Sequence, residues 1–283
     1  MTKRLNNIQI NSIDSIDFKE TQLSIQINLD GFSFCIYKLP ENELIAFQRY
    51  KFTERASTPE RLLRQIETIY DENNLLKYSF KAVKLIHQNE LATLVPTLFF
   101  DKNNLKNYLN HSVKLLENDF ISFENNNCMD VTSVYIPFVN INNFMFHQYG
   151  AFEYYHSFTQ LLELLSKEDL LSTEDKIFVQ VNQHNFELLA FKNNQLKAIN
   201  RFEFSTAEDF IYYILFVAEQ FDMHTENFKL ILLGDIEKQT ELYKITYKYI
   251  RNIVFYYSPL KLGKEFKDIA KHSNFLVLHQ HLI

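Results

Sequence analysis

The chain has 283 residues, 46% of them hydrophobic and 23% charged, so it can bury a sizeable core and is not expected to be disordered. Its net charge of −6 offers no general basic surface for phosphates, so we expect no nucleic-acid partner. Two cysteines, Cys35 and Cys128, form no CxxC pair and predict a reducing, cytoplasmic location without disulfides.

Membrane insertion and the common nucleotide motifs are not expected. Segment Met1–Ile10 has no apolar signal core, and the longest apolar run, Phe210–Ala218, is too short to cross a bilayer. The glycines are too few and too far apart to form a Rossmann or P-loop motif. They are Gly31, Gly150, Gly234 and Gly263.

Two segments of the chain repeat one pattern, Asn28–Phe52 and Asn182–Phe204. Both alternate apolar and polar residues and contain turn-forming residues at the same places, which indicates three short strands in each. The matched pairs are Asn28/Asn182, Phe32/Phe186, Tyr37/Phe191, Lys38/Lys192, Leu44/Leu196, Ala46/Ala198, Arg49/Arg201 and Phe52/Phe204. The agreement favours an internal duplication over chance.

The elements that follow each repeat are also alike. We predict, in the first copy, strands at 23–29, 32–38 and 44–52, a helix to 72, a strand at 80–87, a helix at 102–110 and a closing strand at 131–138. In the second copy we predict strands at 177–182, 186–192 and 196–204, a helix to 221, a strand at 228–233, a helix at 240–252 and a strand at 253–257. Thr58-Pro59 and Ser205-Thr206 carry the helix-start signals of the two copies.

This order predicts an α/β fold with two tandem subdomains, each a mixed sheet of three antiparallel strands plus βα units flanked by helices. The chain resembles the ribonuclease H-like superfamily of actin, sugar kinases and Hsp70, and more closely an uncharacterised bacterial family, domain of unknown function 3822, with an actin-like ATPase fold. The residues that carry this resemblance are Ile27–Tyr37, Thr93–Pro96 before Phe100-Asp101, Tyr135–Pro137 and Leu232–Asp235. We expect subdomains at 1–140 and 176–283, joined by a helical bridge at 141–175.

The resemblance implies an ATP cleft between the two subdomains, with an Asp-x-Gly turn from each hairpin handling phosphate and Mg²⁺. Both hairpins depart from that pattern, because Asn28 and Asn182 stand where the strand-end acid is expected. An amide has no charge to hold a metal. The turn at Gly234 has one glycine where the family usually has a pair. The candidate cleft residues are Asn28, Asp30, Gly31, Ser33, Asn182, Asn185, Gly234 and Asp235.

Each candidate also has a purely structural interpretation. Asp30-Gly31 is a common hairpin turn, and Gly234-Asp235 can simply end a strand. We interpret His279 and His281 as a surface tail, because a two-His set lacks a third ligand. The nearly all-apolar helix Ala207–Phe221 is interpreted as buried between the subdomains. A basic stripe, Lys244, Lys248 and Arg251, is interpreted as a solvated helix face, and residues 151–168 as an amphipathic bridging helix.

Two functions follow from these residues. In the first, the protein is a non-catalytic binding or scaffold protein that holds an unidentified protein partner and uses no cofactor. The alternative is a nucleotide-binding switch or weak ATPase that uses ATP and Mg²⁺ with Asp30 and Asp235 in the cleft. A ribonuclease H-like nuclease is disfavoured, because the strand ends carry Asn where two-metal chemistry needs clustered carboxylates.

Overall fold

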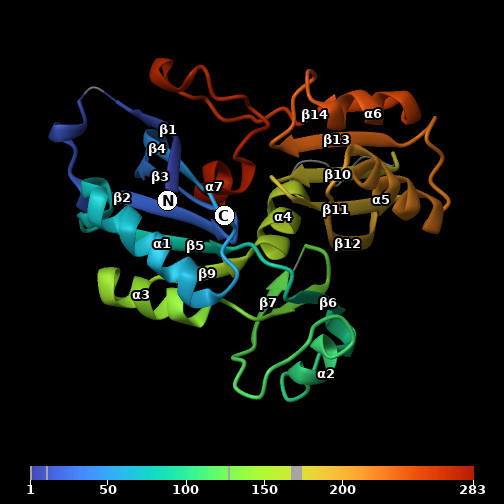
Figure 1. Cartoon of the computed structure of the whole chain (residues 1–283), viewed down its shortest axis with the longest axis horizontal. Coiled ribbons are helices and arrows are strands. Elements are labelled where there is room, and N and C mark those ends of the chain that lie inside the picture. The colour runs from blue at the N-terminus through green and yellow to red at the C-terminus, as the bar shows by residue number, and fades with distance from the viewer. Residues whose placement is uncertain (1, 11, 127, 167–173) are drawn as a thin grey trace. The chain divides into compact units, whose positions relative to one another are not determined.

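The computed structural model describes residues 2–10, 12–126, 128–166 and 174–283, and they divide into two units. The first unit comprises residues 1–164, 261–268 and 276–283. The second comprises residues 165–260 and 269–275. The predicted α/β class is confirmed in both (Figure 1).

The first unit is built on a six-stranded mixed sheet in the order β1-β4-β3-β2-β5-β9. Its strands are β1 (Thr2–Gln9), β2 (Thr21–Asn28), β3 (Gly31–Lys38), β4 (Glu43–Phe52), β5 (Ala82–His87) and β9 (Glu153–His156). The first four strands pair antiparallel, whereas β2, β5 and β9 run parallel. Period-two alternation turns Leu23, Ile25 and Ile27 of β2 toward the core.

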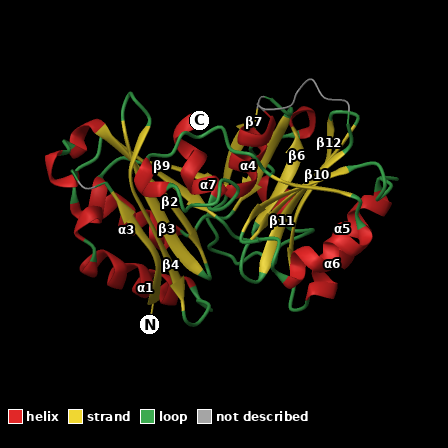
Figure 2. Cartoon of the chain, turned by 90° about the horizontal axis from the view of Figure 1, so that it is seen from above, coloured by secondary structure: helices red, strands yellow, loops and turns green. Residues whose placement is uncertain are grey.

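Two helices cover that face of the sheet, α1 (Pro59–Glu72) and α3 (Val139–Tyr149) (Figure 2). Helix α1 begins where the sequence predicts, because the Thr58 hydroxyl accepts a hydrogen bond from the Arg61 N–H at 3.3 Å and Pro59 occupies the first turn. Its buried side chains recur at helical spacing and join the same core. They are Leu62, Ile66, Ile69 and Tyr70.

The other face of this sheet receives the C-terminal residues of the chain. Cys35 Sγ donates to the Val277 carbonyl at 3.0 Å, and Tyr37 Oη donates to the Leu278 carbonyl at 2.8 Å. The prediction of a surface tail is therefore wrong. The segment forms helix α7 (Phe275–His279), and His279 is only 2% exposed, because an apolar run packs wherever a sheet face is open. Both cysteines are free thiols.

A second, three-stranded sheet is inserted in the first unit between β5 and α3. It contains β6 (Ala92–Pro96), β7 (Ser122–Asn126) and β8 (Val131–Tyr135) in the order β6-β8-β7, next to helix α2 (Leu105–Leu109) (Figure 1). The prediction that 131–138 closes the main sheet is wrong, since β9 pairs with β5 in that place. The helix predicted at 102–110 belongs to this insertion. Alternation shows that a segment is a strand but not which sheet it joins.

The second unit holds a five-stranded sheet in the order β12-β11-β10-β13-β14. Its strands are β10 (Lys176–Val181), β11 (Asn185–Lys192), β12 (Gln195–Glu203), β13 (Lys229–Gly234) and β14 (Asn252–Phe255). Helices α5 (Ala207–Gln220) and α6 (Glu241–Tyr249) lie on one face (Figure 2). Thr206 and Asp209 form a reciprocal capping box at the start of α5.

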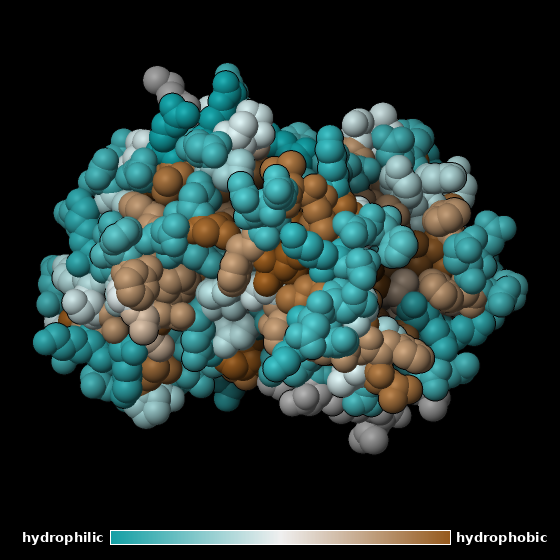
Figure 3. Space-filling view, turned by 90° about the horizontal axis from the view of Figure 1, so that it is seen from below, coloured by the Kyte–Doolittle hydropathy of each residue, from teal (hydrophilic) through white to brown (hydrophobic). Residues whose placement is uncertain are grey.

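Two further predictions need correction. Residues 151–168 are not one helix, because strand β9 precedes helix α4 (Ser157–Ser166), and residues 167–173 of the expected bridge lie outside the described residues. Helix α5 is not buried all round. Tyr212 is 60% and Phe216 44% exposed, and their rings stack on each other. Hydrophobic side chains form patches within a mostly hydrophilic surface on the face drawn in Figure 3.

Candidate functional site

The two hairpin turns share one backbone frame, in which the end of the third strand is tied to the turn. In the first unit, the Phe52 N–H donates to the Asp30 carbonyl at 2.9 Å. In the second, the Phe204 N–H donates to the His184 carbonyl at 3.0 Å. These four residues occupy equivalent positions in the repeat, so Asp30 and His184 are the structural counterparts in the two turns.

The parallel strand beside each hairpin ends in the same way. The Gln88 N–H donates to the Ile27 carbonyl at 2.9 Å in the first unit. In the second unit, the Asp235 N–H donates to the Val181 carbonyl at 2.8 Å. Gln88 and Asp235 are thus equivalent, and each follows the parallel strand that runs beside the hairpin's first strand, at whose end Asn28 or Asn182 lies. Polar side chains therefore gather at the carboxyl ends of the strands, where α/β folds usually bind ligands.

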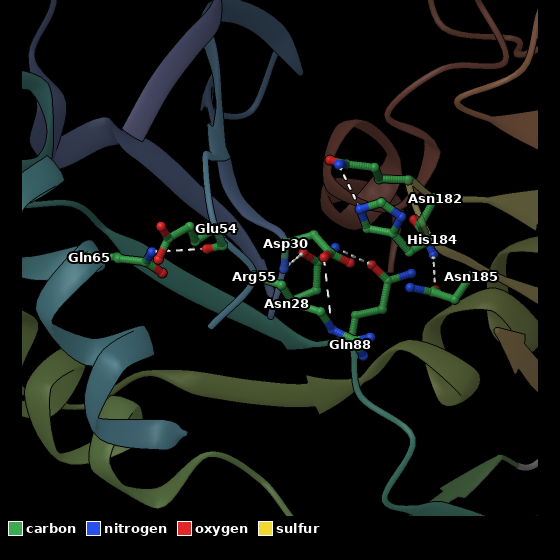
Figure 4. A network of polar contacts seen from close by, with 10 residues as sticks. Asn28, Asp30, Glu54, Arg55, Gln65, Gln88, Asn182, His184 and Asn185 are labelled. Carbon is green, nitrogen blue, oxygen red and sulfur yellow. Dashed lines mark hydrogen bonds and ion pairs between the residues drawn. The ribbon is translucent and has the colours of Figure 1, made fainter. Parts of the chain in front are cut away.

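In the first turn, Asn28 is held by its neighbours (Figure 4). Its Oδ1 accepts from the Asp30 N–H at 2.9 Å, and its Nδ2 donates to Gln88 Oε1 at 3.0 Å. Gln26 Nε2 donates to the same Gln88 oxygen at 2.8 Å. Both ends of the Asn28 amide are therefore engaged in shaping the turn. Gln88 is a central member of this network that the sequence did not single out.

Asp30 carries the carboxylate of the first turn and is only 7% exposed. Its Oδ1 lies 3.9 Å from Arg55 Nε, whereas its Oδ2 is buried and has no hydrogen-bond partner among the described residues. The Arg55 loop is fixed on both sides of the arginine. The Ala56 N–H donates to the Leu29 carbonyl at 2.8 Å, and Gln65 Nε2 donates to the Glu54 carbonyl at 3.2 Å (Figure 4). A buried, half-satisfied carboxylate is a strong acceptor for a donor or a cation.

The glycine of the first turn is explained by strand packing. A Cβ at Gly31 would lie 2.6 Å from the Tyr50 carbonyl oxygen, so a side chain would separate β3 from β4. Ser33 lies on β3 opposite Gln26, with 9% of its surface exposed. The structure thus brings Asn28, Asp30, Gly31 and Ser33 to one end of the first sheet, but it explains Gly31 without a ligand.

The second turn carries amides and a histidine instead of an acid. Asn182 Nδ2 donates to Asn185 Oδ1 at 2.9 Å, and the Asn182 N–H donates to the Asn185 carbonyl at 2.8 Å. The Gln183 amide lies 2.7 Å from His184 Nε2 (Figure 4). Asn185 is fully buried, and its Nδ2 has no hydrogen-bond partner among the described residues.

Gly234 adopts a left-handed conformation with φ +83°, and its amide is already used. A Cβ there would lie 2.1 Å from the Val181 carbonyl oxygen, so only glycine fits against β10. The Gly234 N–H donates to the His272 carbonyl at 2.7 Å, and His272 Nε2 lies 2.8 Å from the Ile236 carbonyl. Since a carbonyl can only accept, the His272 ring donates from Nε2. The segment 269–275, which the sequence did not single out, therefore closes this turn.

One further polar cluster, on strands β10, β11 and β12, was not predicted from the sequence. Arg201 of β12 pairs with Glu187 of β11 in register, and the three guanidinium nitrogens of Arg201 are buried without a hydrogen-bond partner among the described residues. Glu187 is fully buried, and Gln180 Oε1 is buried without a hydrogen-bond partner in the described part of the chain. Guanidinium groups usually pair with carboxylate or phosphate oxygens. The repeat aligns Arg49 with Arg201, which marks the position in the sequence. That alignment does not predict that the Arg201 guanidinium is buried.

A metal centre is not formed by the described part of the chain. It contains no group of three or more His, Cys, Asp or Glu side chains arranged to hold a metal ion. His281 stacks on Tyr37 with 3.8 Å between the ring centroids, and burial lowers its pKa to about 4. These contacts give His281 a packing role on the first sheet.

The architecture defines an actin-like ATPase fold. A crystal structure from Bacteroides thetaiotaomicron, described as a protein with actin-like ATPase fold and unknown function, is 25% identical to this chain with a TM-score of 0.76. The match covers 85% of this chain and 93% of that one. In the PilM-PilN type IV pilus biogenesis complex, a chain 11% identical matches with a TM-score of 0.54, covering 90% of this chain and 91% of that one. At that identity the likeness shows the fold alone.

The protein belongs to the family described as protein of unknown function (DUF3822), whose model matches residues 10–253. This confirms the family resemblance drawn from the sequence. A search of curated proteins finds no match. Within the described residues, no helix combines the length and apolar character needed to cross a membrane.

Proposed function

We propose that this protein is a binding or scaffold protein that keeps the actin-like fold without hydrolysing ATP. The observation that carries the proposal is the hydrogen bond from the Gly234 N–H to the His272 carbonyl, at 2.7 Å. In related folds this kind of turn approaches the nucleotide, as the family resemblance implies. Here its amide is saturated by the chain itself, so a ligand would have to displace residues 269–275.

The hairpin turns support the same proposal. Mg²⁺ is held by hard, charged oxygen ligands, usually one or two carboxylates together with phosphate oxygens. Asn28 and Asn182 supply amides at the two equivalent strand ends, and both are engaged in hydrogen bonds inside their own turns. ATP with Mg²⁺ therefore fits these residues poorly. A protein partner suits the fold, since one fold neighbour is part of a two-protein complex, PilM-PilN.

Thermal unfolding with and without millimolar ATP and Mg²⁺ tests the proposal. A ligand at about a hundredfold its Kd would stabilise the protein by about 2.7 kcal/mol, which corresponds to about 5–10 °C in Tm for a chain of this size. We expect no such shift and no phosphate release above the rate without protein. A shift of that size would contradict the proposal.

A nucleotide-binding switch or weak ATPase is the second candidate, and Asp30 is the observation that favours it. Its buried Oδ2 has no partner among the described residues, and Arg55 Nε lies 3.9 Å from Oδ1. If ATP raises Tm, Asp30→Ala should abolish the shift, whereas Asp14→Ala, at an exposed acid of the same unit, should not. A shift that survives Asp30→Ala would exclude this turn as the binding site.

A further inference from the structure

A cavity of about 330 Å³ lies within the second unit, against the face of its sheet opposite to helices α5 and α6. Strand register places Phe178 of β10, Ile231 of β13 and Val254 of β14 side by side on this face (Figure 1). The other lining residues are Leu165, Lys229, Phe255, Tyr256 and Tyr257. The volume is within the range of cavities that bind small molecules.

The lining of the cavity is apolar except for one charge. Phe178 and Ile231 are buried, whereas Val254 is 38% and Tyr257 74% exposed, so the cavity opens to the surface beside β14. Lys229 is the one charged side chain among the lining residues. Cavities that bind small molecules typically combine apolar walls with a few polar groups that fix the orientation of the ligand. This cavity therefore suits a mostly apolar molecule with a single charge.

The ammonium group of Lys229 is available to such a ligand. Its Nζ forms no hydrogen bond or ion pair with another described residue. Lys176, in register with Lys229 on β10, is 4% exposed and has an interaction of its own, so Lys229 alone supplies the charge. Because an ammonium group binds a carboxylate through charge-assisted hydrogen bonds, the charge of the ligand is negative.

The lining residues follow the strands, with the charge at one end. Lys229 lies opposite Asn252 in the register of β13 and β14, and Val254 and Tyr256 follow at alternate positions on the same face. The rise of a strand places Asn252 and Tyr256 about 13 Å apart. A ligand with its anionic group at Lys229 would therefore extend its apolar part past Ile231 and Val254 toward Tyr256.

The first unit differs at the equivalent place and serves as an internal comparison. Counting back from the equivalent strand ends aligns Lys84 with Ile231. The row Ser24, Lys84 and Glu153 of the first sheet thus corresponds to the row Phe178, Ile231 and Val254 of the second. The first row is polar, and Lys84 Nζ donates to a main-chain oxygen of Ile283. The chain itself therefore packs on that face of the first sheet, whereas the apolar row of the second sheet lines a cavity.

We propose that this cavity binds a straight-chain monocarboxylate. The carboxylate pairs with Lys229, and the hydrocarbon chain lies against Phe178, Ile231 and Val254. This inference goes beyond the proposed function, because the ligand is a small molecule and its charged group binds away from the hairpin turns. Lys229 begins β13 and Gly234 ends it, so the two residues are about 16 Å apart.

Isothermal titration calorimetry of the full chain with butyrate, hexanoate and octanoate tests the proposal. Each methylene group that becomes buried should tighten binding about fourfold, so octanoate should bind about a hundredfold or more tightly than butyrate. Octanol, which has the same chain without the charge, should bind the wild-type protein about tenfold more weakly than octanoate. These comparisons need no variant.

Two substitutions then locate the site. Lys229→Met keeps an apolar side chain and should weaken octanoate binding about tenfold, without changing the binding of octanol. The matched control is Lys106→Met, since Lys106 lines a mostly polar cavity of about 400 Å³ in the first unit. This control should bind octanoate like the wild type, and thermal unfolding should show that both variants are folded.

Three outcomes would overturn the proposal. The first is no binding of octanoate at millimolar concentration. The second is equal affinity of the wild-type protein for butyrate and octanoate, which would show that the chain is not buried. The third is equal weakening of octanoate and octanol binding in Lys229→Met, which would show that Lys229 shapes the cavity without pairing with the carboxylate.

Discussion

The two units of this protein carry the same turn frame and complete it in different ways. In the first, the frame holds a half-satisfied carboxylate, Asp30, and the residue after β5 is a glutamine, Gln88. In the second, the turn holds amides, and β13 ends in Gly234, whose N–H is closed by residue 272. A duplicated backbone therefore does not preserve duplicated chemistry, since the side chains and the final segment decide what each turn can bind.

The largest expected loss of stability is at Gly234, the last residue of β13, where the two units differ. Gly234→Ala would place a Cβ 2.1 Å from the Val181 carbonyl and force a left-handed conformation on alanine, so we expect a loss of about 4 kcal/mol in the free energy of unfolding. The first unit has His87 at the equivalent position, outside the left-handed region. Urea denaturation measures the difference.

Gly150→Ala is the matched control for this substitution. Gly150 also has positive φ, at +72°, but a Cβ there meets no atom within 4 Å. Only the conformational cost of φ +72° and ψ −130° remains, about 1–3 kcal/mol for a residue with a side chain. If both substitutions lowered the free energy of unfolding equally, β10 and β13 could move apart without cost to fit a side chain. Packing would then not require glycine at position 234.

A pH-dependent effect is expected in the first unit, where Glu124 covers the edge of β9. Burial raises its pKa to about 7 from 4.5, against hydrogen bonds from Thr159, Tyr135 and the His156 N–H. Its stabilising contribution is therefore complete below about pH 4.5 and is lost as the pH rises through about 7, by about 3 kcal/mol in all.

Glu124→Gln should remove this dependence. The variant should unfold at higher urea concentration than the wild type above pH 7, and the difference should shrink as the pH falls toward 4.5. Glu90→Gln, at an exposed acid of the same unit, should leave the profile unchanged. Parallel profiles for the wild type and Glu124→Gln would contradict the assignment to this carboxyl group.

The smallest expected effect compares the two equivalent helix starts. Thr206 accepts from the Asp209 N–H at 3.0 Å in a reciprocal capping box. Thr58 accepts from the Arg61 N–H at 3.3 Å, and the Arg61 side chain has no acceptor that could return the bond. We expect Thr206→Ala to cost about 1–2 kcal/mol and Thr58→Ala about 1 kcal/mol.

Thermal or urea unfolding resolves a difference between the two caps if the variants are measured together. Thr68→Ala, in the middle of α1, is the control, because its hydroxyl bonds back to the Arg64 carbonyl of the same helix at 2.9 Å and caps no helix end. That substitution should change stability by no more than about 0.5 kcal/mol. A larger cost at Thr58 than at Thr206 would show that the reciprocal bond adds nothing.

Much of the local structure could be predicted because it depends on neighbouring residues. The alternation around Phe32 and Phe186 predicts the hairpins, and Thr58-Pro59 predicts the start of α1. Strand β9 could not be found in the same way, since Glu153–His156 is short and has no clear alternation. The sequence pattern also could not predict which sheet β8 joins, because strand pairing depends on segments that lie far apart in the sequence.

The sequence by itself determined the repeated order of strands and helices, the family, and the absence of acids at Asn28 and Asn182. Only the tertiary structure decided which polar groups remain available. The Gly234 N–H is closed by residue 272, Asp30 Oδ2 has no hydrogen-bond partner among the described residues, and β14 pairs with a neighbouring strand on one side. The physical reason is that a periodic pattern or a cap arises from residues a few positions apart. The satisfaction of a buried donor or a strand edge depends instead on segments far along the chain.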